Sequence, residues 1–249
     1  MRGWFLLWVC LLPIAVADEG AARQRITLSW EREDRTREVG LELRWVERSG
    51  RRYEVRGERL WYRQLGGERR PWPDYDSATS TGEPPVHLPW QGTAMEALLG
   101  QSVEVELDAQ GRAIAVRDWQ EAFDGMIASF RTEEQVSEGD VAEYRGRFEA
   151  TLLSSIFNVV GWSPPAAALE PGARWSATRS SELGSVRSEF TVRAIEAETI
   201  AIEVGGALGG GSQTGRLLLD RRSHRVREAT IEQRTASGSL THRIRLEPL

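Results

Sequence analysis

Two segments of this chain carry strand-forming residues on either side of a short turn. They are VEVELDAQGRAIAV, residues 103–116, and GRLLLDRRSHRVREATI, residues 215–231. In each segment, apolar residues run up to an aspartate, a few turn-forming residues follow, and arginine leads into more apolar residues. This order is typical of two antiparallel strands joined by a turn, so both segments are predicted to be hairpins of an antiparallel sheet.

The first segment also predicts which side chains face the core. Val103, Val105 and Leu107 share one face of the strand, while Glu104 and Glu106 share the other. The aspartate and glycine of its DAQG turn suit the first and fourth positions of a type I turn. The likeness of the two segments has two possible origins. One is duplication within the chain, and the other is convergence, because unrelated meandering hairpins use the same turn chemistry.

Alternation with a period of two extends over much of the remaining chain. It is present between residues 24 and 66 and returns after residue 174, and the closing hairpin is predicted to pair 226–233 with 240–246. Gly, Pro, Ser and Asp dominate 66–92, which is predicted to be a long loop with a short strand near its middle. A helical turn is expected over 93–99.

Two helices are predicted between these β-rich parts. The first begins at Asp118, a candidate N-cap, and the second runs from about residue 140 to 160, where glycine and two prolines end it. The apolar stripe of the first helix consists of Trp119, Phe123, Met126, Ile127 and Phe130.

The fold class expected from this order is α+β and mainly β. We expect curved antiparallel sheet of meandering hairpins, like a half-barrel, with two amphipathic helices inserted between two β-rich halves. The expected parts are a signal peptide at 1–17, a β-rich half at 18–117, a helix pair at 118–162 and a second β-rich half at 163–249. One continuous sheet and two separate β-domains both fit this pattern.

The first residues, MRGWFLLWVCLLPIAVA, have the features of a secretory signal peptide. Arg2 precedes an apolar stretch too short to span a membrane, and small residues end at Ala17, the expected cleavage site. A buried strand or an anchor helix is the alternative. Val9 precedes Cys10, where a lipoprotein would carry a small residue. We therefore expect export to the periplasm or medium of a Gram-negative-like bacterium, without a transmembrane segment after cleavage.

Composition limits the chemistry available to the processed chain. Cys10 is the single cysteine, so cleavage after Ala17 would leave no disulfide, thiolate nucleophile or cysteine-ligated metal. All basic residues other than histidine are arginine, which excludes a serine–lysine dyad. The formal net charge of −5 argues against nucleic acid as a partner.

Two motifs together resemble a family of exported bacterial proteins of unknown function. One is GQSVEVELDAQGRAIAV followed directly by an amphipathic helix, and the other is WSPPAAALEPGARW at 162–175; YDS at 75–77 fits the same pattern. The resemblance covers most of the processed chain and implies an envelope location and no known activity. The architecture is also similar to the half-barrels of lipoprotein-carrier proteins, in which a sheet wraps helices over an apolar cavity.

Several familiar sites do not match this sequence. The glycine-rich segment 205–215 lacks the lysine and following helix of a phosphate-binding loop, so we interpret it as a connection between strands. His87, His224 and His242 are far apart and lack zinc-ligand spacing, and the closing hairpin is expected to bring His242 near Ile231 or Glu232. We expect no metal and no cofactor.

The candidate catalytic residues are Asp74, Asp76 and His87, all in the long loop. Two loop carboxylates separated by one residue could act as acid and base, or bind Ca²⁺. The alternative is that they accept hydrogen bonds in turns, as aspartates in Pro-rich loops commonly do.

The candidate ligand-binding residues are Trp61, Trp72 and Trp90, which bracket the same loop. Flat aromatic rings can form platforms for sugars or apolar ligands. The alternative is that these rings anchor a long loop to the sheet, because a loop of this length needs anchoring to stay ordered.

These observations favour a non-catalytic envelope protein that binds or presents an apolar or polymeric ligand. Expected partners are a lipid, a sugar polymer or an envelope protein. A periplasmic hydrolase that uses the loop carboxylates is one alternative, since loops on rigid sheets often carry function. A structural subunit of an envelope assembly is another, and would expose an apolar patch.

Overall fold

The computed structural model describes residues 21–32, 35–66, 74–79, 90–133, 137–162, 165, 169–181 and 184–249. Its strands are β1 (Ala22–Arg32), β2 (Arg35–Ser49), β3 (Arg52–Leu65), β4 (Tyr75–Asp76), β5 (Ser102–Leu107), β6 (Ala113–Arg117), β7 (Arg174–Ser181), β8 (Gly184–Ile195), β9 (Thr199–Leu208), β10 (Gly211–Asp220), β11 (Val226–Arg234) and β12 (Thr241–Pro248). Its helices are α1 (Trp90–Ala97), α2 (Gln120–Glu133), α3 (Glu138–Thr151) and the π-helix η1 (Leu152–Phe157).

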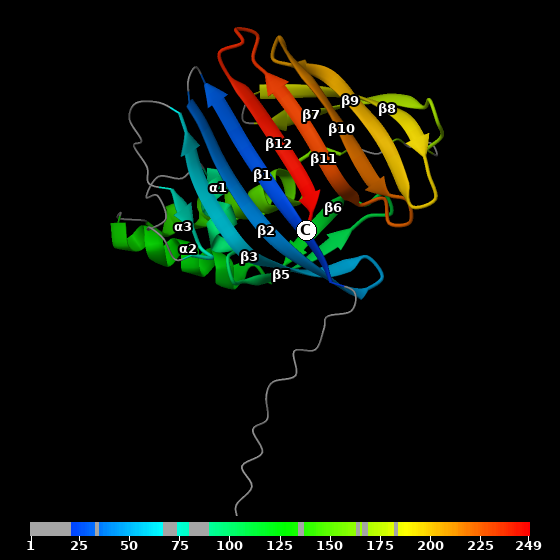
Figure 1. Ribbon diagram of the computed structural model, residues 1–249. Coiled ribbons are helices and arrows are strands. Elements are labelled where there is room, and N and C mark those ends of the chain that lie inside the picture. Colours follow the sequence, from blue (N-terminus) through cyan, green and yellow to red (C-terminus); the bar gives the residue numbers. More distant parts are fainter. Residues whose placement is uncertain are drawn as a thin grey trace, which may run out of the picture.

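The described strands form a single twelve-stranded antiparallel sheet, which confirms the expected fold class. Its order is β6-β5-β3-β2-β1-β12-β11-β10-β9-β8-β7, with β4 added beside β3. The two β-rich halves join where the first strand pairs with the last, placing Ile26 opposite Leu246. The chain therefore builds one curved, open sheet rather than two β-domains (Figure 1).

The alternation in the sequence correctly predicted the buried face of the sheet. Val103, Val105 and Leu107 are buried in the core, whereas Glu104 and Glu106 remain partly exposed on the other face. The closing hairpin forms as predicted, and its register places His242 opposite Gln233, the residue next to Glu232.

The helices pack against one face of this sheet (Figure 1). Helix α1 contacts β3, and η1 contacts β6. Phe148, Leu152 and Ile156 carry the apolar stripe of the second predicted helix and are buried. Within the described part of the chain, no helix is long and apolar enough to cross a bilayer.

Both helix starts differ from those predicted. Helix α2 begins at Gln120, and Asp118 adopts a left-handed conformation with a φ of 58°, so it precedes the helix rather than capping it. Helix α3 begins earlier than predicted, because Ser137 and Asp140 form a reciprocal capping box. The second predicted helix also changes type, since its end is the π-helix η1 and Gly161 follows with a φ of 63°.

The glycine-rich segment 205–215 connects strands, as expected. It spans the end of β9, a two-residue turn and the start of β10. Gly209 and Gly210 both have positive φ angles, 49° and 90°, which a tight hairpin turn of this kind requires.

The two hairpin turns recognised in the sequence contact one another. Asp108 and Asp220 each accept hydrogen bonds from the backbone of their own turn. A Cβ atom at Gly111 would lie 2.4 Å from the carbonyl carbon and oxygen of His224, so the two backbones are in direct contact. The β5–β6 turn thus meets the β10–β11 turn at one end of the sheet.

Candidate functional site

The largest described hollow lies between the β2–β3 turn and the β10–β11 turn, beside the end of β5, and we call it the end groove. It is open to solvent and has a volume of about 1030 Å³. Its walls are formed by Ala22, Trp45, Glu47, Gly50, Arg51, Tyr53, Glu106, Leu107, Asp220, Arg222, Ser223, Arg225 and Arg227. Because these residues come from both β-rich halves, the groove exists only when the two halves are joined.

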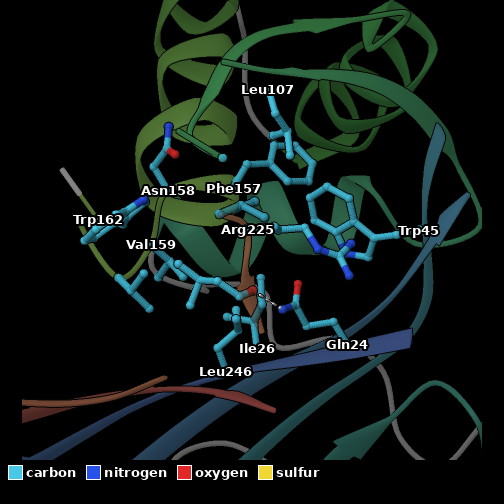
Figure 2. Close-up of a pocket in the computed structure, with 14 residues that line it drawn as sticks. Gln24, Ile26, Trp45, Leu107, Phe157, Asn158, Val159, Trp162, Arg225 and Leu246 are labelled. Carbon is cyan, nitrogen blue, oxygen red and sulfur yellow. Dashed lines mark hydrogen bonds between the residues drawn. The ribbon is translucent and has the colours of Figure 1, made fainter. Parts of the chain in front are cut away.

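A smaller hollow, the inner cleft, continues from the end groove toward the core (Figure 2). Its walls are formed by Gln24, Ile26, Trp45, Leu107, Gly111, Ile156, Phe157, Asn158, Val159, Val160, Trp162, Arg225, Val226 and Leu246. Trp45, Leu107 and Arg225 line both hollows and therefore stand between them. The inner cleft has a volume of about 30 Å³, roughly the room that one water molecule needs.

Aromatic rings form the apolar wall of the end groove. Trp45 on β2 and Tyr53 on β3 meet edge to face, with ring centres 5.9 Å apart. Phe157 reaches the other side of Trp45 with a centre distance of 5.7 Å. The π-helix helps to place Phe157 there, since one extra residue per turn changes where the following side chains project.

Arg225 lies between the groove and the cleft. Its guanidinium carbon lies 5.2 Å from the ring centre of Trp45 and 5.8 Å from that of Tyr53 (Figure 2). Its backbone is fixed by the turn, where Asp220 N–H donates to its carbonyl and its own N–H donates to Ser223 Oγ. Burial lowers the pKa of Arg225 from its usual value, because desolvation disfavours the charged form.

The rim of the end groove carries both signs of charge. Arg51, Arg222 and Arg227 contribute positive charge, and Glu47 and Asp220 contribute negative charge. The carboxylate of Asp220 is already occupied by the backbone and hydroxyl donors of its own turn. The rim is therefore polar, whereas the wall beneath it is aromatic and apolar.

Trp61, a candidate ligand platform, lies away from this groove. Its side chain is 5% exposed, and its indole N–H donates to Glu38 Oε1 at 3.1 Å. Arg25 and Arg59 place their guanidinium carbons 5.3 and 5.7 Å from the centre of the ring. This geometry favours the anchoring interpretation, since a ligand would first have to displace the arginines.

Three other predicted residues lie outside the described residues. These are Trp72, His87 and the expected cleavage residue Ala17. Trp90 begins helix α1, but its side chain is outside the described part. The proposed joint action of His87 with the loop carboxylates therefore stays a prediction.

The two candidate carboxylates have structural partners. Asp76 accepts two hydrogen bonds from Arg59, at 3.0 and 2.5 Å, and one from the backbone N–H of Ala78. Asp74 accepts a hydrogen bond from the backbone N–H of Gln64. The Arg59 guanidinium lowers the pKa of Asp76, because hydrogen bonds and positive charge favour the ionised form. A lowered pKa makes Asp76 a poorer base at neutral pH.

The ion pair predicts a pH-dependent contribution to stability. Asp76→Asn is expected to lower the free energy of unfolding by about 1 kcal/mol at pH 7, within the range for partly exposed pairs. Since the folded-state pKa lies below the unfolded value of about 3.9, the difference between wild type and variant should shrink as the pH falls below that value. Urea unfolding of the wild-type protein and the Asp76→Asn variant at several pH values measures this difference in stability.

Asp124→Asn is the matched control for this prediction. Asp124 lies on the exposed side of α2, so the same chemical change should alter stability by less than about 0.5 kcal/mol at every pH. Equal, pH-independent losses in the two variants would contradict a stabilising pair between Asp76 and Arg59.

The residues that the groove brings together were not recognised as a site from sequence. Trp45 belongs to a strand whose alternation is visible in the sequence, and it is buried, but its position beside a hollow depends on distant residues. Arg225 lies in a turn rich in arginine and has no periodic signal of its own. Among the described residues, no group of three or more His, Cys, Asp or Glu side chains could hold a metal ion.

Comparison with known families assigns the chain to an uncharacterised group. Residues 74–246 match the family of unknown function DUF6263. The chain belongs to this family. The match spans β4 to β12 and so includes the second hairpin turn and Arg225. No curated protein matches the chain.

Among solved structures, this DUF6263 protein is similar to a chain from the structure described as lipid–protein interactions in lipovitellin. The TM-score is 0.53 with 9% sequence identity, and the match covers 92% of this chain. It covers 25% of the lipovitellin chain, so the protein spans about a quarter of that chain's length. At this identity the likeness establishes a shared fold.

Proposed function

We propose that this protein is an exported, non-catalytic carrier or receptor that binds an apolar chain, such as that of a lipid, in the end groove. The observation that carries the proposal is the groove itself, an open hollow of about 1030 Å³ whose aromatic wall leads toward the core. Trp45, Tyr53 and Leu107 supply the apolar wall of this groove, and the charged residues that make up much of the remaining lining supply polar groups that orient a ligand. The apparent signal peptide at 1–17 supports an exported location.

The likeness to lipovitellin adds support from the fold. That structure concerns lipid–protein interactions, and in this protein the shared fold is a curved sheet with helices against one face. Here the helices and core side chains fill most of that face, and the described end groove is the largest space left beside it. We therefore place the ligand at the end of the sheet rather than deep within it.

The proposal predicts saturable binding of a neutral single-chain lipid. A monoacylglycerol with bromine on its acyl chain should quench tryptophan fluorescence, because Trp45 lines the groove. Ala22→Phe should weaken binding about tenfold, which corresponds to roughly 1.4 kcal/mol of lost apolar contact. Ala22 pairs with Trp45 and lines the groove, so the added ring occupies the ligand's space.

Ala201→Phe provides the control for this experiment. Ala201 lies on the outer side of β9, on the face opposite Ile200 and Ile202, so the same added ring should leave binding unchanged. Absence of saturable quenching in the wild-type protein would refute the proposed function. Equal weakening by both substitutions would place the ligand elsewhere.

A further inference from the structure

We propose that Arg225 and the indole N–H of Trp45 form a subsite for the anionic headgroup, a carboxylate or phosphate, of an amphipathic ligand. This inference rests on the proposed function, because the subsite lies in the wall of the end groove and would orient a chain bound there. It goes further by naming the chemical class of the ligand and the two groups that select it.

Arg225 carries a positive charge that has no ion-pair partner among the described residues. Its Nη1 atom is buried and makes no hydrogen bond, and no described carboxylate lies within ion-pairing distance of its guanidinium. The guanidinium lies over the rings of Trp45 and Tyr53, which attract its charge but do not replace an oxyanion as acceptor of its in-plane hydrogen bonds. A guanidinium stays protonated even when buried, so the charge persists in the groove wall.

The nearest acidic groups do not neutralise this charge. Glu47 and Asp220 line the same groove and attract the Arg225 charge, but neither is close enough to form an ion pair with it. Asp220 is held in its turn by the donors of Arg222 and Ser223. Arg227 lies on the same rim and adds further positive potential.

Trp45 supplies a second donor at the same place. Its side chain is only 5% exposed, and its Nε1 atom is buried without a hydrogen-bond partner. Figure 2 shows the indole beside the guanidinium of Arg225, and both side chains line the groove and the inner cleft. Buried donors normally have partners, so two unsatisfied donors side by side indicate a place for an acceptor.

A carboxylate or phosphate matches these donors better than a neutral headgroup does. Guanidinium groups bind such oxyanions with strong, charge-assisted hydrogen bonds, and the indole N–H can donate to a second oxygen. A neutral ester or alcohol would leave the buried charge without a counter-ion. The aromatic wall of Trp45 and Tyr53 then runs beside the start of the acyl chain.

The test compares ligands with the same chain and different headgroups. Isothermal titration of the purified protein with dodecanoate, dodecyl phosphate and dodecanol, each below its micelle-forming concentration, measures the selectivity directly. We expect at least one of the two anions to bind about tenfold or more tightly than the alcohol. Inorganic phosphate and acetate, titrated alone, show whether a free anion binds without a chain.

Variants then show which side chains cause the preference for an anionic headgroup. Arg225→Met should lower the affinity for the preferred anion about tenfold, to that for dodecanol, while dodecanol binding stays within about twofold. Trp45→Phe removes the indole donor and should lower the preference for the anion in part. Arg227→Met is the matched control, because Arg227 is exposed on the same rim and its loss should change anion affinity less than about threefold.

Each outcome decides between the two proposals. Equal binding of anions and dodecanol to the wild-type protein overturns the headgroup subsite and leaves the proposed function intact. Inorganic phosphate that binds as tightly as dodecyl phosphate assigns the site to a free anion and also overturns it. Lack of binding by every chain-bearing ligand refutes both. The wild-type comparison does not depend on any variant folding.

Discussion

Replacing Phe148 with alanine is expected to lower the free energy of unfolding by about 3–5 kcal/mol, the usual cost of deleting a buried phenyl ring. Phe148 is fully buried, and its ring centre lies 5.9 Å from that of Trp119 and 5.7 Å from that of Phe123. It is the one large buried side chain of α3, where Thr151 is the other buried residue. The substitution therefore removes the largest buried side chain of this helix, while Val141 and Tyr144 keep their partly buried contacts with the core.

Two measurements check this expectation. Urea unfolding gives the loss of stability, and hydrogen exchange should show faster exchange in α3 while the central strands remain protected. Glu149→Ala is the control, because Glu149 is the adjacent, exposed residue of the same helix and its replacement should cost less than about 0.5 kcal/mol. A loss below about 1 kcal/mol for Phe148→Ala would show that α3 is held in place by other contacts.

The parts of the fold that could be predicted from sequence are those with a local period. Ile200, Ile202 and Val204 alternate along β9, and all three are buried as their spacing requires. Phe148 and Leu152 recur at helical spacing and are fully buried. Periodicity identifies these faces because side chains of one face recur at the fixed spacing of the strand or helix. Those that face the core are apolar, and those that face water are polar.

The pairing of the first strand with the last has no such local signal. Strands β1 and β12 are separated by nearly the whole chain, and the match of Ile26 with Leu246 is decided by the assembled core. This pairing determines that the sheet is continuous. It also brings Ala22 of β1 to the same hollow as Arg225, which precedes β11. The helix start at Gln120 was missed for a different reason, because a residue suited to capping, Asp118, adopts a positive φ instead.

The candidate site was missed because its chemistry arises from packing. The loop aspartates and tryptophans were chosen for their residue types, and Asp76 and Trp61 both have arginine partners in the structure. Arg225 appears in the sequence as one of several surface arginines. The assembled fold places its guanidinium against Trp45 and Tyr53 of the other β-rich half, where its Nη1 atom is buried without a hydrogen-bond partner.

The contact between those turns leads to the second large prediction. Gly111→Ala is expected to lower the free energy of unfolding by about 2–4 kcal/mol, the sum of backbone strain and overpacking. Gly111 has a φ of 78°, which disfavours a side chain, and its Cβ would lie 2.4 Å from the backbone carbonyl of His224. The position of a Cβ atom is fixed by its own backbone, and the atoms that it would meet belong to the backbone of residues 224 and 225, so side-chain rotation cannot relieve the clash.

Gly238→Ala separates the two contributions to this loss. Gly238 also has a positive φ, 68°, in a hairpin turn, but its Cβ would meet no atom within 4 Å. Its replacement should therefore lower the free energy of unfolding only by the backbone strain of a positive φ, about 1–2 kcal/mol. The excess loss at Gly111 measures the contact between the turns. That variant should also bind the brominated monoacylglycerol more weakly, because Gly111 lines the inner cleft, which shares Trp45, Leu107 and Arg225 with the end groove. Equal losses at the two positions, with unchanged lipid binding, would mean that the turns are not held together in solution and that the groove has no fixed wall.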